Sequence, residues 1–200
     1  MNFEKYRILL SRVAVIIFLF FFITTENYWE VNNEYISFSL FFIGIVLVAI
    51  ASLGRMWCSI YIAGYKDDKL VMEGPYSMSR NPLYFFSAIG TLGIGCVTET
   101  FTFPIVFIIL FSIYYPYVIK SEEIRLKKIF GSYFDEYVKR VPAFFPKFSI
   151  FSEPQKYNVN PLVYRQHILS ALWFIWTVGI IELIEGIKEI GLITPLWQIY

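Results

Sequence analysis

Five apolar runs, each close to the length of a membrane crossing, constrain the fold of this 200-residue chain more than any other feature. A helix needs about 20 apolar residues to cross a hydrocarbon core of roughly 30 Å. Because 57% of the residues are hydrophobic and only 16% are charged, the composition excludes an ordinary soluble domain. We predict an all-α fold, a polytopic membrane helical bundle in which residues 1–200 form a single integral membrane domain. About five transmembrane helices are expected, at residues 8–23, 36–54, 83–97, 101–119 and 168–184.

Basic residues are distributed unequally between the segments that join these runs. Two precede the first run, nine lie between Lys120 and Arg165, and four lie between the second and third runs: Arg55, Lys66, Lys69 and Arg80. The remaining segments, 24–35, 98–100 and 186–200, contain one basic residue beside five glutamates. Lys and Arg are retained on the cytoplasmic side of a membrane. The pattern therefore predicts a cytoplasmic N-terminus and a C-terminus on the opposite side.

The third and fourth runs are joined by only three residues, Thr98–Thr100. A connection this short predicts a tight antiparallel hairpin, which would bring the far ends near Tyr84 and Ile119 together. The third run also contains three glycines, Gly90, Gly93 and Gly95. These favour close helix packing, although a nucleotide-contacting turn at residues 93–95 is the alternative.

The segment after the fourth run predicts further helices outside the membrane. Residues 121–130 should continue the fourth helix up to Gly131, and Ser132 with Asp135 has the form of a capping box for a second helix. Four positions of that helix should share one face, against the membrane or the bundle: Tyr133, Phe134, Tyr137 and Val138. Pro142 and Pro146 should end it.

A dense polar and aromatic motif, Gly74–Tyr84, precedes the third run. Its Gly-Pro pair favours a turn, and Pro82 suits the first turn of the next helix. Arg80 and Asn81 offer hydrogen-bond donors to an anionic group. A snorkelling arginine within an interfacial tyrosine belt is the alternative interpretation.

A second motif follows the fourth run. It begins with the adjacent carboxylates of Glu122 and Glu123 and continues through residues 130–133 and 137–142. Two neighbouring carboxylates near the negative end of a helix dipole repel each other, and a cationic ligand would relieve this repulsion. Solvated glutamates paired with nearby lysines are the alternative.

Taken together, with the helical hairpin between them, the two motifs resemble those of the isoprenylcysteine carboxyl methyltransferases and their smaller prokaryotic relatives. The resemblance covers about residues 65–148, a segment that would be the methyltransferase core. It implies an enzyme that binds S-adenosylmethionine at the cytoplasmic face, under a cap of cytoplasmic helices. Such an enzyme methylates a lipid-like acceptor, for example a prenylcysteine-like carboxylate, which reaches the site from the bilayer.

The resemblance also implies particular site residues. Carried over by position, the cofactor-binding set is Tyr76, Arg80, Asn81, Pro82, Tyr84, Glu122, Glu123, Arg140 and Pro142, to which Tyr133 is added as an aromatic ring that could pack on adenine or sulfonium. The catalytic set would be Arg80, Asn81 and Glu123.

S-adenosylmethionine carries a sulfonium, an ammonium and a carboxylate, so its pocket needs groups of both charges. We expect Glu122 or Glu123 to accept from the ammonium, and Arg80 or Arg140 to hold the carboxylate.

Two positions depart from the pattern of the family. Asn81 occupies a position where histidine is usual in the family, although some relatives also have asparagine there. The eukaryotic enzymes have an arginine, tied to the substrate carboxylate, shortly before the glutamates, where the nearest base here is Lys120. Lys120 is therefore the candidate substrate residue.

Methyl transfer to an ionised carboxylate needs no proton transfer, so alignment of the reacting atoms can supply the acceleration. We expect His167, the single histidine, to be interfacial and without a catalytic part. Cys58 and Cys96 lack metal-like spacing, and we expect buried thiols and no metal site.

Three other functions are compatible with the same features. They are a phospholipid N-methyltransferase, a sterol-reductase-like enzyme that uses NADPH, and a non-catalytic membrane scaffold. The expected partners are the lipid bilayer and a lipophilic small-molecule or prenylated acceptor, and no nucleic acid is expected.

Overall fold

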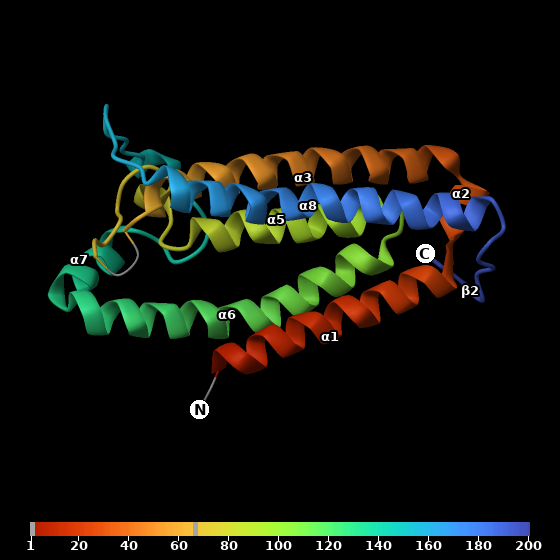
Figure 1. Cartoon of the computed structure of the whole chain (residues 1–200), viewed down its shortest axis with the longest axis horizontal. Helices are drawn as coiled ribbons and strands as arrows, with labels where there is room; N and C mark the ends of the chain where they lie inside the picture. Colours follow the sequence, from red (N-terminus) through yellow and green to blue (C-terminus); the bar gives the residue numbers. More distant parts are fainter. Residues whose placement is uncertain (1–2, 66–67) are drawn as a thin grey trace.

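A computed structural model describes residues 3–65 and 68–200 of the chain, with side chains described from residue 12 onward. Five long helices make up most of the bundle (Figure 1): α1 (Phe3–Thr24), α3 (Glu34–Ile62), α5 (Pro82–Val97), α6 (Thr102–Phe130) and α8 (Pro161–Glu189). The shorter elements are α2 (Tyr28–Asn32), α4 (Pro75–Met78), α7 (Ser132–Arg140), the 3-10 helix η1 (Phe148–Ile150), and the strands β1 (Thr25–Asn27) and β2 (Trp197–Ile199).

The predicted all-α membrane bundle is confirmed. Four of the five predicted runs lie within one of the long helices, and the run at residues 101–119 begins one residue before α6. Three helices, α3, α6 and α8, are long and apolar enough to cross a membrane. Two shorter apolar helices accompany them, at Arg12–Thr24 and Pro82–Val97. Large apolar side chains such as Phe38, Ile113 and Trp176 are more than 60% exposed, as expected for a surface that faces lipid. The chain is thus an integral membrane protein.

Helix α8 begins seven residues before the predicted run, at Pro161 instead of residue 168. The side chain of Asn160 accepts hydrogen bonds from the backbone N–H groups of Leu162 and Val163, and Pro161 occupies the first helical position. An Asn cap followed by Pro starts a helix through backbone geometry, without an apolar residue. A search for apolar runs therefore misses this first part of α8.

Helices α3, α5 and α8 pack against one another, and α6 packs on α5 (Figure 1). A Cβ on Gly93 of α5 would lie 2.9 Å from the carbonyl oxygen of Gly44 on α3, and one on Gly95 would lie 2.7 Å from Cα of Pro104. These glycines are buried inside a regular helix. The prediction of close packing is confirmed, and the alternative of a nucleotide-contacting turn is wrong.

The predicted hairpin between α5 and α6 is also confirmed, since α5 ends at Val97 and α6 begins at Thr102. Glu99 in the turn has a φ of 57°, a left-handed conformation that is uncommon for a non-glycine residue. Its carboxylate accepts hydrogen bonds from the side chains of Ser37 and Asn27. The turn is therefore fixed by polar contacts to α3 and β1.

The end of the bundle that carries this turn, called here the opposite end, holds the two short strands, which the sequence did not predict. Thr25–Asn27 pairs in parallel with Trp197–Ile199. Lys188 donates from Nζ to the carbonyl oxygens of Phe22 and Thr25, at 2.6 and 2.9 Å, and so caps the C-terminal end of α1.

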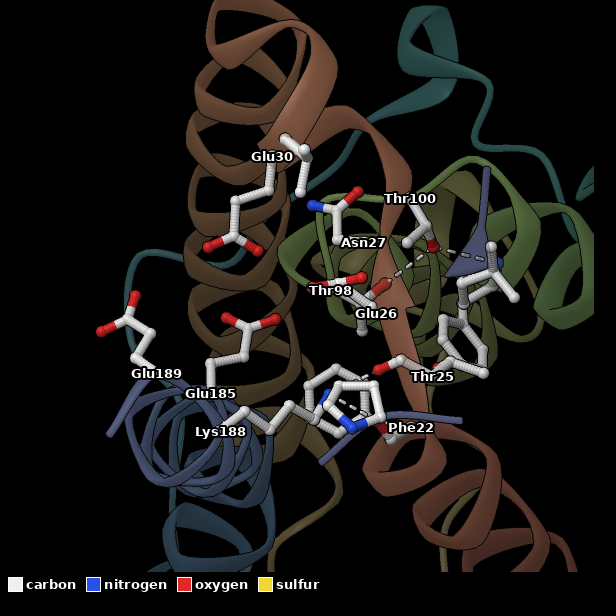
Figure 2. A pocket seen from close by; sticks show the side chains of 14 residues that line it. Phe22, Thr25, Glu26, Asn27, Glu30, Thr98, Thr100, Glu185, Lys188 and Glu189 are labelled. Atoms are coloured by element: carbon white, nitrogen blue, oxygen red, sulfur yellow. Dashed lines mark hydrogen bonds between the residues drawn. The ribbon is translucent and has the colours of Figure 1, made fainter. Parts of the chain in front are cut away.

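A cavity of about 340 Å³ lies at the opposite end. Figure 2 shows the carboxylates of Glu30 and Glu185 facing each other across it, with Lys188 reaching toward Phe22. Glu26 and Glu189 also line this cavity. The concentration of glutamates there agrees with the uneven distribution of charge along the sequence.

Two further sequence expectations need correction. The apolar runs place Arg55 in the segment between the second and third runs, but Arg55 lies inside α3, because that helix continues to Ile62. Lys66 lies outside the described residues. No side chain caps the start of α7, where Gly131 adopts a φ of 54°, and Asp135 pairs instead with Lys127 at 2.8 Å.

The buried face of α7 is narrower than predicted. Phe134 and Tyr137 are buried together with Val141. Tyr133 is 73% exposed and Val138 is 37% exposed, although both were expected on the same face.

Candidate functional site

The two sequence motifs meet at one point in the structure, which we call the motif site. Arg80 lies in the turn between α4 and α5, and Glu123 lies on α6. The Arg80 Nε donates to the Glu123 Oε1 at 2.8 Å, across 43 residues of sequence. The two side chains are only 11% and 24% exposed, so the pair is shielded from solvent more than an ordinary surface ion pair.

Arg80 also holds the chain that follows α7. Its Nη1 donates to the carbonyl oxygens of Val141 and Val138 at 2.6 and 3.2 Å, and its backbone N–H donates to the carbonyl oxygen of Pro142 at 2.9 Å. A guanidinium at a helix C-terminus satisfies carbonyl groups that have no partner within the helix. One arginine therefore fixes α6, the end of α7 and the first motif relative to each other.

Asn81 is buried beside this arginine, with 6% of its surface exposed. Its Nδ2 donates to the carbonyl oxygen of Ala143 at 2.9 Å and to the Glu123 Oε1 at 3.4 Å. Pro82 is buried and begins α5, as predicted. The amide of Asn81 thus binds both the Glu123 carboxylate and the extended chain after α7. Both contacts require a hydrogen-bond donor at this position.

Sequence reasoning missed two further residues that hold the motifs together. The Ser79 hydroxyl donates to the carbonyl oxygen of Phe144 at 2.9 Å. The Tyr137 hydroxyl donates to the backbone carbonyl oxygen of Tyr76 at 2.6 Å. Both residues belong to the two motifs, but no sequence pattern indicated that their partners would be the carbonyl group of Tyr76 and that of Phe144, just after the second motif.

Burial raises the pKa of both tyrosine hydroxyls at this site. The pKa of Tyr76 lies well above its ordinary value because its ring is buried, and the pKa of Tyr137 is raised by burial and by the nearby Glu123 carboxylate. Both hydroxyls are therefore protonated at neutral pH. Neither can act there as a general base.

The remaining predicted site residues surround this centre at different depths. The ring of Tyr76 packs in a buried cluster with Cys58 and Tyr61, so its backbone, more than its ring, faces the second motif. Tyr84 lies one turn further along α5, with its ring against that of Tyr115 at a centroid distance of 5.3 Å.

Glu122 does not join the Arg80 pair. It is bound by Arg125 one turn along α6, at 2.5 Å, and both side chains are more than a third exposed. Arg140 is exposed and Pro142 half-buried near the end of α7, whereas Tyr133 and Lys120 are exposed to solvent. The structure therefore brings Arg80, Asn81, Glu123 and the backbone of Pro142 together, and it leaves Tyr133 and Lys120 outside their contacts.

Residues 33–133 match the phospholipid methyltransferase family. Over 181 residues the chain is 36% identical to the nickel-cobalt-cadmium resistance protein NccN of Alcaligenes xylosoxydans xylosoxydans, covering 90% of this chain and 84% of that protein. Over 189 residues it is 32% identical to the cobalt-zinc-cadmium resistance protein CzcN of Cupriavidus metallidurans, covering 94% and 86%. Protein-S-isoprenylcysteine O-methyltransferase B of Arabidopsis thaliana is 29% identical over 141 residues, covering 69% and 71%. No solved structure matches the chain significantly.

The family match spans half of the chain and contains the Arg80–Glu123 pair together with the helical hairpin that separates the two motifs. The distant likeness to isoprenylcysteine methyltransferases agrees with the resemblance of the motifs themselves. The chain belongs to the phospholipid methyltransferase family.

Proposed function

We propose that the chain is an S-adenosylmethionine-dependent methyltransferase that acts on a lipophilic acceptor at the cytoplasmic face of a membrane. The observation that carries this proposal is the meeting of Arg80, Asn81 and Glu123 from two distant motifs. Charged groups of both signs, partly shielded from water, suit a donor that is itself a zwitterion with an additional positive sulfur.

The residues of the motif site fit the proposed donor. Glu123, and Glu122 beside it on α6, offer carboxylates to an ammonium group, and Arg140 offers an exposed guanidinium to a carboxylate. Tyr84, one helical turn after Asn81 on α5, supplies an aromatic surface. Because Arg80 and Glu123 contact each other directly, a ligand that binds between them has to replace part of this pair.

When bound, S-adenosylmethionine would supply an electrophilic methyl group on a positively charged sulfur. The residues of this chain would bind the donor, orient it toward the bilayer and exclude water from the reacting atoms. A carboxylate acceptor would already be ionised at neutral pH, so the residues of the motif site would need only to align it with the methyl group of the donor. No proton moves, and no general base is needed.

The names of two relatives suggest a part in resistance to divalent metals. Among the described residues, no group of three or more His, Cys, Asp or Glu side chains is placed to hold a metal ion. Arg80, Asn81 and Glu123 of the motif site, in contrast, lie within the matched methyltransferase region. We therefore propose methyl transfer as the activity, with any part in metal resistance following from the modified lipid or acceptor.

The test is transfer of radiolabelled methyl from S-adenosylmethionine into a total lipid extract by the purified protein in mixed micelles. We expect label in a chloroform-soluble product with the native protein and none with Glu123→Gln. If the native protein binds NADPH and not S-adenosylhomocysteine, the chain is instead a reductase of the sterol type. If it binds neither nucleotide, the scaffold interpretation holds.

A further inference from the structure

A second polar centre lies inside the bundle, about two helical turns from the motif site, around Arg55 on α3. Its Nη1 donates to the hydroxyl of Ser87 on α5 at 2.5 Å, and its Nη2 donates to the hydroxyl of Ser170 on α8 at 3.2 Å. Its guanidinium carbon lies 5.6 Å from the centre of the Phe174 ring. Three helices therefore converge on one arginine.

The charge of Arg55 has no counterion among the residues that the structure describes. The ion pairs of these residues involve other side chains. The Arg55 Nε is buried and finds no hydrogen-bond acceptor within the same part of the chain. Neutral serine hydroxyls do not compensate a full charge, and an unpaired arginine within a membrane is costly. Such a group indicates an anionic ligand.

The space next to Arg55 has the shape and polarity for an amphiphile. A cavity of about 370 Å³ is lined by Arg55, Ser87 and Thr91 on its polar side. Leu169 and Trp173 of α8 line its other side, and each is 65% exposed on the outer surface of the bundle. The cavity therefore has a cationic inner wall and an apolar mouth toward lipid.

This cavity is connected to the motif site through two aromatic rings. Tyr115 of α6 lines the cavity, and its ring contacts that of Tyr84 at 5.3 Å. Along α5, Ser87 lies six residues beyond Asn81, which corresponds to roughly 9 Å at about 1.5 Å per residue. This separation is comparable to the length of a lipid headgroup.

We propose that the cavity holds the anionic group, a carboxylate or a phosphate, of the amphiphilic methyl acceptor, and that Arg55 positions it. This assignment rests on the proposed methyltransferase function. In this assignment the charge of the acceptor is bound by Arg55, within the bundle, and not by Lys120, which is exposed on α6. The acceptor would enter past Leu169 and Trp173 on the face of α8, with its chain remaining in lipid.

The experiment is calorimetric titration of the full-length protein in neutral detergent micelles with four probes: oleate, dioleoyl phosphatidic acid, oleyl alcohol and inorganic phosphate. The variants are Arg55→Met and, as a matched control, Arg165→Met, an exposed arginine of α8 that does not line the cavity. S-adenosylhomocysteine is titrated into every variant to report on folding and on the motif site.

We expect oleate or phosphatidic acid to bind the native protein and Arg165→Met with equal affinity, and Arg55→Met at least tenfold more weakly. S-adenosylhomocysteine should bind all three alike. The preferred acidic probe distinguishes a carboxylate from a phosphate acceptor. If Arg55→Met fails to fold, Ser170→Ala, which removes one partner of the arginine, should still weaken the acidic probes severalfold.

The proposal would be overturned if Arg55→Met and Arg165→Met bound the acidic probes with equal affinity. It would also be overturned if the native protein bound oleyl alcohol as tightly as oleate. Binding of inorganic phosphate as tight as that of the lipids would overturn the amphiphilic acceptor. Arg55-dependent lipid binding without any binding of S-adenosylhomocysteine would preserve the anion site and contradict the methyltransferase function. Binding of S-adenosylhomocysteine without Arg55-dependent lipid binding would preserve the methyltransferase function and refute the anion site.

Discussion

The guanidinium of Arg80 and the carboxylate of Glu123 are paired at 2.8 Å, although 43 residues and a complete helical hairpin separate them in the chain. Neither motif can adopt its observed geometry without the other, because Arg80 also fixes the carbonyl groups of Val138 and Val141 at the end of α7. The stability of this end of the bundle and its capacity to bind a ligand are therefore coupled.

This coupling predicts that Arg80→Met and Glu123→Gln each lower the free energy of unfolding by about 1–3 kcal/mol, because each leaves a shielded polar partner unsatisfied. The double variant should lose less than the sum of the two. Unfolding titrations in mixed micelles measure these values. Glu122→Gln is the control, since its exposed pair with Arg125 should contribute only about 0–1 kcal/mol. Additive losses would show that the pair is not coupled.

Tyr137→Phe should lower the free energy of unfolding by about 1 kcal/mol, because the hydroxyl that donates to the Tyr76 carbonyl oxygen is lost and that buried acceptor is left unpaired. Tyr133→Phe removes a hydroxyl from the same helix, but from a side chain that is 73% exposed, and should change stability by less than about 0.5 kcal/mol. The same unfolding titration compares the two variants. Equal effects would mean that the Tyr137 bond does not form.

Gly93→Leu should disrupt the bundle, because even a Cβ at this position would lie 2.9 Å from the Gly44 carbonyl oxygen and from the backbone of Val48. We expect a loss of several kcal/mol or a failure to fold, seen as aggregation in size-exclusion chromatography. Gly179→Ala is the matched control, since a Cβ there meets no atom within 4 Å. It should leave stability unchanged or raise it by up to about 1 kcal/mol. A folded, native-like Gly93→Leu would contradict the close approach of α3 and α5.

The opposite end predicts a dependence of stability on pH. Burial, and then the carboxylates of Glu99, Glu189 and Glu26, raise the pKa of Glu30 above its ordinary value of 4.5, while Lys188 opposes them. A raised pKa in the folded state means that ionisation of Glu30 destabilises the fold, so this cost is absent below about pH 4.5 and appears as the pH rises through the folded-state pKa.

Glu30→Gln should consequently be more stable than the native protein at pH 7, and the difference should shrink as the pH is lowered toward 4. Thermal unfolding at both pH values measures this. Glu34→Gln, which replaces an exposed glutamate at the start of α3, is the control for the loss of a surface carboxylate. A Glu30→Gln protein that is less stable than the native protein at pH 7 would contradict the raised pKa.

The sequence predicted the features that depend on local pattern. Apolar runs located five helices, Gly131 marked the end of α6, and the three-residue link fixed the hairpin. It could not predict features that depend on distant partners, such as the strand pair of Thr25–Asn27 with residues 197–199. Arg55 shows the same limit, because a basic residue at the end of an apolar run reads as a loop residue unless the serines on α5 and α8 that bind it are known.

At the motif site, the residue types and the order of the motifs were sufficient to predict that Arg80 and Asn81 approach the glutamates. Which of Glu122 and Glu123 pairs with Arg80 was not predictable, since adjacent positions on a helix point in directions about 100° apart. The structure resolves it, with Glu123 toward Arg80 and Glu122 toward Arg125.

Calorimetric binding of S-adenosylhomocysteine to the purified native protein and to Glu123→Gln tests the central claim most directly. We predict saturable one-site binding to the native protein and at least tenfold weaker binding to the variant, with no measurable binding of NADPH to either. A folded native protein that shows no saturable binding, or a Glu123→Gln variant that binds as tightly as the native protein, would contradict a donor site built on the Arg80–Glu123 pair.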